Sequence, residues 1–159
     1  MQAYRSNSVR SPSCLSNPHG LQLVYPQYPT PTTDVPAAVH ALITAMKSIQ
    51  TSLQAWASVR AAAEKVSDAY INFGNAFNAV VHAFSAYNID TRDIHPIPQR
   101  LRSILEVCLG QNPSPAALSA YMPEVRQQLF DVLAGLRTKQ AAWRAATGRP
   151  PLLLPVSLD

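Results

Sequence analysis

The chain has 159 residues, a formal net charge of +4 and only 14% charged side chains. This length suits one domain with a sizeable core. The weak positive charge falls short of the strongly basic surface that is typical of nucleic-acid binding. No apolar run approaches the roughly 20 residues of a membrane-spanning helix, and no hydrophobic signal segment is visible at the N-terminus. We expect a cytoplasmic protein without a nucleic-acid partner, whose membrane contact is at most peripheral.

Residues 1–35 are rich in Ser and Pro, and we predict that they form a disordered arm. Proline fixes the backbone and lacks an N–H group, so its repeated use here forbids a helix. Leu21, Val24 and Tyr28 are unusually apolar for such an arm, which leaves docking of this part on the core as an alternative. We place a helical bundle domain at residues 36–149 and a short apolar tail at residues 150–159.

The first helix is predicted to begin at Pro36, because the first helical turn does not use the N–H group that proline lacks. Its large apolar side chains recur at gaps of three and four residues, which places them on one face. This stripe consists of Val39, Leu42, Met46, Ile49, Leu53 and Trp56. Lys47 is the only charged residue between Pro36 and Val59. The helix is therefore either a core element alone or also a surface for self-association.

The second helix carries a longer stripe with the same spacing, and most of its members are aromatic. The stripe consists of Val66, Tyr70, Phe73, Phe77, Val80, Phe84 and Tyr87. Leaving these rings in water would cost a few kcal/mol each, so we expect them to be buried. Gly74 lies within this helix and indicates either close helix packing or a bend. Asn88 is a plausible left-handed residue at the helix end.

Helical signals continue to the C-terminus. A third helix is predicted to follow a rigid loop that includes Pro96 and Pro98 and to stop at Gly110, and Ser114 is expected to cap a short helix. Pro123 is predicted to end that helix and to begin the last one, which runs to about Ala146. No segment alternates with the period of two that strands require. The predicted fold is all-α: an antiparallel bundle of three long and about two short helices.

Residues with catalytic or metal-binding chemistry are scattered. None of the four histidines is spaced with another histidine, a cysteine or a carboxylate as metal ligands are. No nucleophile, acid–base pair or glycine-rich phosphate loop is recognisable. We expect a protein that is not an enzyme and has no cofactor and no metal. A pocket among the aromatic side chains near Phe77 and Phe84 is a further possibility.

Candidate partner-binding residues fall in two groups. A helical wheel places Asn75, Asn78 and His82 on one polar strip of the second helix, although Asn78 is also a candidate to bond a neighbouring helix end or loop. The cationic candidates on the last helix are Arg126, Arg137, Lys139 and Arg144, and Arg149 at the helix exit belongs to the same basic end. Cations near a helix C-terminus complement the helix dipole. They also fit an acidic partner such as anionic lipid or an acidic filament surface.

Three segments of the chain carry a family resemblance. They are VSDAYINFGNAFNAVVHAFSAYNID (residues 66–90), PQRLRSILEVCL (residues 98–109) and YMPEVRQQLFDVLAGLRTKQ (residues 121–140). In order and spacing they resemble the N-terminal domain of the fungal actin-interacting protein 3 family, also called bud-site-selection protein 6. The resemblance covers about residues 36–144. Phe73 stands where this family has leucine, and Arg60 and Lys65 lie in a link that is usually acidic.

The resemblance implies a scaffold and targeting domain of the polarisome. Such a domain would self-associate as a homodimer and dock to cortical polarity partners, with a formin and the microtubule-end machinery as candidates. It would act at the cell cortex at polarised growth sites, in association with the cytoskeleton. The alternative function is direct binding of a cytoskeletal filament or an anionic membrane through the basic helix end. The family's coiled-coil region, which binds actin monomers and stimulates the formin, has no counterpart in this chain.

Overall fold

The computed structural model describes residues 34–158, and the regular structure of this part of the chain is entirely helical. Five helices follow one another: α1 (Val35–Ala57), α2 (Ala63–Ser85), α3 (Ile97–Leu109), α4 (Pro115–Thr138) and α5 (Gln140–Thr147). Three are long and two are short, which confirms the predicted all-α bundle. Almost the whole predicted arm of residues 1–35 lies outside the described residues. Val35, which we assigned to that arm, is the first residue of α1 and is buried.

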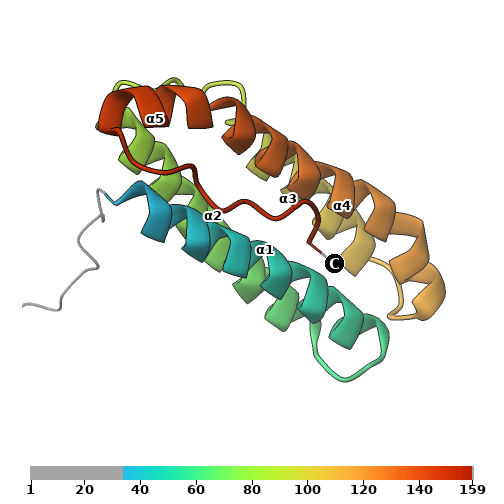
Figure 1. Cartoon of the computed structure of the whole chain (residues 1–159). Coiled ribbons are helices and arrows are strands. Elements are labelled where there is room, and N and C mark those ends of the chain that lie inside the picture. The colour runs from blue at the N-terminus through green and yellow to red at the C-terminus, as the bar shows by residue number, and fades with distance from the viewer. Residues whose placement is uncertain (1–33, 159) are drawn as a thin grey trace, which may run out of the picture. The chain divides into compact units, whose positions relative to one another are not determined.

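Helices α1 and α2 form an antiparallel pair joined by residues 58–62 (Figure 1). Both predicted stripes are confirmed. All members of the α1 stripe are buried, and so are all members of the α2 stripe except Tyr70 and Tyr87, which are partly buried. Tyr70 donates a hydrogen bond to the carbonyl oxygen of Pro98 at 2.9 Å. The ring of Tyr87 meets that of Trp143 edge-on, with 5.1 Å between the ring centroids. The rims of the stripe thus contact α3 and α5.

The ends of this helix pair are shaped by two residues in the left-handed region. Val59, in the connection after α1, has a φ of 56°. Asn88, beyond α2, also has a φ of 56°, and the backbone N–H of Ile89 then bonds the carbonyl oxygen of Phe84 at 3.1 Å. This is the reversal that we predicted from Asn88, although α2 itself ends earlier, at Ser85.

Helix α4 differs from the prediction because it continues through Pro123. Ser114 caps it as expected, accepting a hydrogen bond from the N–H of Ala117 at 3.0 Å. An apolar stripe runs without interruption across the proline: Leu118, Met122, Val125, Leu129, Val132 and Leu136. Ser119, whose carbonyl lacks its helical donor, and Pro123 are both exposed, so this carbonyl lies on the solvent side of the helix. Burial of a continuous stripe therefore outweighs the hydrogen bond lost at the proline.

The break that we predicted at Pro123 occurs instead at Lys139, between α4 and α5. Thr138 donates its hydroxyl to the carbonyl oxygen of Gly135 at 2.7 Å near this point. Helix α5 is turned away from the axis of α4 (Figure 1). The turn lets Trp143 become fully buried against Tyr87 at the end of α2.

After α5 the chain turns at Gly148, whose φ is 65°, and returns without regular secondary structure. Residues 150–158, which we call the C-terminal tail, run along the bundle between α1 and α4 (Figure 1). Leu152 of the tail is buried, and Leu154 and Leu158 are partly buried against the core.

The glycine that permits close packing is Gly135 and not Gly74. A Cβ at Gly135 would overlap the Cγ2 of Ile94, because the loop between α2 and α3 lies directly on α4 there. A Cβ at Gly74 would meet no atom of the described residues within 4 Å. The close-packing interpretation of Gly74 is therefore wrong.

We predict opposite effects of alanine at these two helical glycines. Gly135→Ala should lower the free energy of unfolding by about 1–3 kcal/mol, because the added methyl forces Ile94 away from α4. Gly74→Ala, the matched control, should raise it by about 0.5–1 kcal/mol through helix propensity. Urea denaturation followed by circular dichroism measures both. A stabilising Gly135→Ala would contradict the packing described for Ile94.

Candidate functional site

The polar strip of α2 lies on the surface, as we predicted. Asn75, Asn78 and His82 are all exposed. Ile71, at the same helical spacing, is 57% exposed and extends the strip by one turn. Within residues 34–158 no hydrogen bond or ion pair joins the side chains of Asn75, Asn78 or His82 to the rest of the domain. The expected bond from Asn78 to a neighbouring helix end or loop is not formed there, and we refer to these four residues as the α2 strip.

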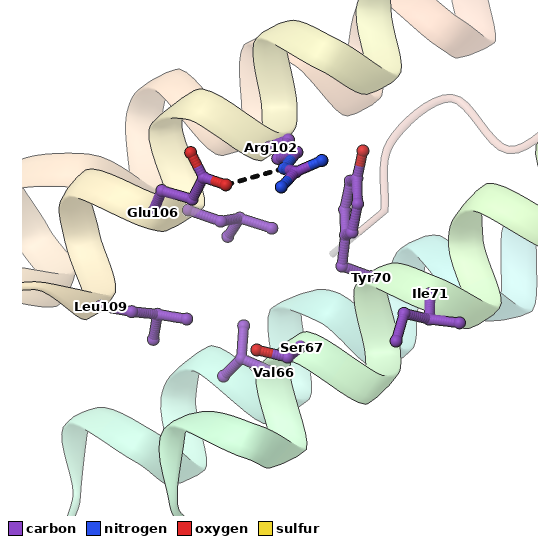
Figure 2. Close-up of a pocket in the computed structure, with 8 residues that line it drawn as sticks. Val66, Ser67, Tyr70, Ile71, Arg102, Glu106 and Leu109 are labelled. Carbon is purple, nitrogen blue, oxygen red and sulfur yellow. Dashed lines mark hydrogen bonds and ion pairs between the residues drawn. The ribbon is translucent and has the colours of Figure 1, made fainter.

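An apolar cleft adjoins the α2 strip where α2 faces α3 (Figure 2). Its volume is about 310 Å³. The lining residues are Val66, Ser67, Tyr70, Ile71, Arg102, Leu105, Glu106 and Leu109. The pocket expected near Phe77 and Phe84 does not correspond to this cleft, since both of those rings are buried in the core and neither lines it.

The polar residues that line this cleft are Ser67, Tyr70, Arg102 and Glu106. Arg102 donates from Nε to Glu106 Oε1 at 2.7 Å, and the ring of Tyr70 rises from α2 toward this pair (Figure 2). Burial raises the pKa of the Tyr70 hydroxyl, and the charge of Arg102 opposes this only in part. Tyr70 is thus a neutral donor at physiological pH, and its hydrogen bond to Pro98 fixes the ring between the helices.

The four predicted cations of the last helix do not form one patch. Arg144 and Arg126 are exposed, on α5 and α4 respectively, whereas Arg137 is half-buried and Lys139 is buried. Arg149, just beyond α5, forms an exposed ion pair with Asp34 at 3.2 Å. The sequence placed Arg137, Lys139 and Arg144 at one basic end, but two of these three make internal contacts.

Lys139 forms the most buried ion pair of the described residues. Its side chain is 6% exposed, and its Nζ lies 2.6 Å from Oδ1 of Asp93, which is 53% exposed. This pair joins the α2–α3 loop to the turn between α4 and α5, one helical turn beyond the contact between Ile94 and Gly135. A buried ammonium needs such a partner, so Lys139 contributes to the fold and not to the surface charge.

Arg137 binds the C-terminal tail. Its Nη2 donates to the carbonyl oxygens of Pro155, at 2.6 Å, and Val156, at 3.3 Å. Its guanidinium carbon also lies 5.9 Å from the ring centroid of Phe130. Gln140 adds a bond from Nε2 to the carbonyl oxygen of Leu152 at 3.1 Å. Both side chains therefore hold the backbone of the tail.

Arg126 lies further along α4, beside the far end of the tail. It lines a hollow with Gln50, Phe130, Leu133, Ser157 and Leu158. It also borders a second hollow of about 420 Å³, together with Lys47 of α1 and the side chain of Leu158. These cations face the groove between α1 and α4.

The sequence did not indicate these internal roles of the cations. Arg137 and Lys139 have acceptors 18 and 46 residues away along the chain, and no local spacing predicts such pairs. The sequence does not show how the tail is seated either, because residues 152–154 are all leucine and only the structure shows that Leu153 is the exposed one.

Two features are absent from the described part of the chain. No group of three or more His, Cys, Asp or Glu side chains there is arranged to hold a metal ion. No helix among α1 to α5 is long and apolar enough to cross a bilayer.

Comparison with known proteins gives one family. Residues 36–144 match the family model described as the Aip3p/Bud6 N-terminal domain, which identifies a polarity-related protein domain. The match spans α1 to α4 and reaches into α5, but it leaves out the C-terminal tail. Neither the curated proteins nor the solved structures include a significant match to this chain.

We predict that the buried ion pair contributes to stability. Asp93→Ala should lower the free energy of unfolding by about 1–3 kcal/mol, because it leaves the Lys139 ammonium buried without its partner. Glu106→Ala, which removes the exposed partner of Arg102, is the matched control and should change the unfolding midpoint little. Thermal unfolding of the two variants compares them. Equal effects would show that Lys139 does not depend on Asp93.

Proposed function

The chain belongs to the Aip3p/Bud6 N-terminal domain family, and on this premise we propose that it is a non-enzymatic scaffold domain of the cell-polarity machinery. In this role it self-associates and docks protein partners at the cell cortex. A formin and microtubule-end proteins are the candidate partners. The observation that supports the proposal best is the α2 strip, an exposed helix face within the matched residues that the fold does not use.

The chemistry of the α2 strip suits a protein partner. The amides of Asn75 and Asn78 can each donate and accept hydrogen bonds, and His82 adds a ring that can do either. Ile71 provides an exposed apolar contact beside the α2–α3 cleft. An uncharged polar row next to an apolar hollow resembles the composition of interface cores, where charged residues are depleted.

Self-association finds support on the outer face of α1. This face bears small, uncharged and exposed side chains at gaps of four and three residues: Ala37, Ala41, Thr44, Ser48 and Thr51. Small side chains at this spacing allow another helix to approach closely without desolvating a charge. We propose this face as the contact between two copies of the chain.

The alternative, binding of a filament or an anionic membrane through the basic helix end, has less support. Lys139 is buried against Asp93, and Arg137 is bound to the tail. Arg144 and Arg149 remain exposed. Arg149 is paired with Asp34, so two of the four cations of the predicted basic end are exposed and one of those two is neutralised by an ion pair. This small charge gives a weak electrostatic attraction that physiological salt would screen.

We predict that charge on the α2 strip abolishes partner capture. The full chain carrying Asn75→Arg and Asn78→Arg is used as bait in a fungal extract. It should retain at least about tenfold less formin or microtubule-end protein than the unaltered chain does, because unpaired charges buried in the interface oppose docking. Capture is quantified with antibodies to these partners. Ala120→Arg, at an exposed position of α4, is the matched control and should capture them normally.

Retained capture by the α2 variant would contradict the assignment of the α2 strip. Self-association is judged separately by measuring the mass of the full chain at tens of micromolar. A strictly monomeric chain would contradict that part of the proposal, and Ala41→Glu with Ser48→Glu should convert a dimer to a monomer.

A further inference from the structure

The C-terminal tail lies between α1 and α4 as a peptide lies in a receptor groove. Leu152 is 7% exposed, whereas the next residue, Leu153, is 93% exposed and Val156 is 85% exposed. Leu154 and Leu158 are packed against the core. Over Leu152 to Leu154 the side chains alternate between groove and solvent, as they do in an extended segment, and the backbone then bends at Val156 before Leu158 returns to the core. The leucines therefore provide the apolar contacts, and the residues between them contribute little to the fit.

The groove holds the backbone of this segment independently of its sequence. Arg137 donates to the carbonyl oxygens of Pro155 and Val156, and Gln140 donates to that of Leu152. Main-chain carbonyls are present in every peptide, so these contacts recognise an extended conformation. Selectivity must come from the leucine positions, because those are the side chains that enter the groove.

Positive charge marks one end of the groove. The hollow beyond Leu158 is lined by Lys47, Gln50, Thr51, Gln54 and Arg126, and none of these side chains is a carboxylate. In the sequence the residue after Leu158 is Asp159. A peptide with an acidic residue directly after its last leucine complements these two cations.

The groove and its occupant differ in their relation to the family. The groove residues are Lys47, Gln50, Arg126, Phe130, Leu133, Arg137 and Gln140, and all of them fall within the matched residues 36–144. The C-terminal tail falls outside that range. These groove residues thus lie within the matched range, whereas the segment that fills the groove lies after it.

We propose that the α1–α4 groove is a docking site for an extended peptide of a partner protein, one with a Leu-x-Leu-Pro sequence and an acidic residue after a later leucine. The C-terminal tail is an internal competitor for this site. A short tether gives such a competitor a millimolar effective concentration, so a partner peptide binds well only when the tail is displaced. This inference concerns a face different from the α2 strip and stands even if the α2 strip binds nothing.

The test uses the full chain and a fluorescent peptide with the sequence of residues 149–159. Leu152→Asp with Leu154→Asp should release the tail and should bind the peptide at least about tenfold more tightly than the unaltered chain, as measured by fluorescence anisotropy. Leu153→Asp with Val156→Asp is the matched control, since it adds the same charges at exposed positions. It should bind the peptide as weakly as the unaltered chain.

Two further measurements define the site. Adding Arg137→Ala to the released variant should weaken binding at least about fivefold, and a peptide with Asp159→Lys should bind at least about threefold more weakly. Circular dichroism verifies that each variant is folded, and Leu152→Ala with Leu154→Ala replaces the aspartate pair if that pair unfolds the chain.

Several results would overturn the proposal. Equal binding by the released variant and the unaltered chain would show that the tail does not compete for the groove. Insensitivity to Arg137→Ala would place the peptide elsewhere. The unaltered chain could form a dimer that becomes monomeric in the released variant. This result would show that each groove binds the tail of a second copy and not a peptide of a partner protein.

Discussion

The large apolar side chains of α1 and α2 bury one another along the full length of both helices, and the rest of the structure depends on that contact. Each helix repeats its stripe at the spacing that keeps one face toward the other. Tyr70 and Tyr87 of the α2 stripe are only partly buried by the core. They lie at the rims of the stripe and contact α3 and α5, and this fixes where the second half of the chain must lie.

Most charged side chains of residues 34–158 are exposed, and Lys139 is the one that is buried. Few residues are charged, and two of the cations on the C-terminal side hold loops and the tail in place. Lys139 joins the α2–α3 loop to the turn before α5, and Arg137 binds the tail across the groove. What remains for partners is a helix face of amides, a small apolar cleft and a groove with cations at one end. These surfaces suit protein and peptide ligands better than a polyanion.

The helix pattern could be predicted from the sequence because periodicity alone determines which face of a helix is buried. The stripes of α1 and α2, the cap at Ser114 and the left-handed Asn88 all follow from local rules. Pro123 and Lys139 were misjudged because a propensity rule competes there with tertiary burial. The apolar stripe continues past the proline, whereas the contacts of Asp93 and Trp143 favour the turn at Lys139.

In the candidate site, too, local sequence rules predicted some features, whereas others depend on tertiary contacts. The exposure of Asn75, Asn78 and His82 follows from a helical wheel, and the structure places them as expected. The roles of Arg137 and Lys139 could not be predicted in this way, because the groups that accept their hydrogen bonds are distant in sequence. Gly74 and Gly135 could not be distinguished either, since only the path of the α2–α3 loop shows which of them has a close neighbour.

The C-terminal tail occupies the α1–α4 groove through its leucines while Arg137 holds its backbone. Nuclear Overhauser measurements between methyl groups of the unaltered chain test this arrangement, because Leu158 and Leu133 line the same hollow although they are far apart in sequence. We expect a cross-peak between the methyl groups of these two leucines, and Arg137→Ala should weaken it. If Leu158 shows no cross-peak to any groove residue in the folded chain, the tail does not occupy the groove.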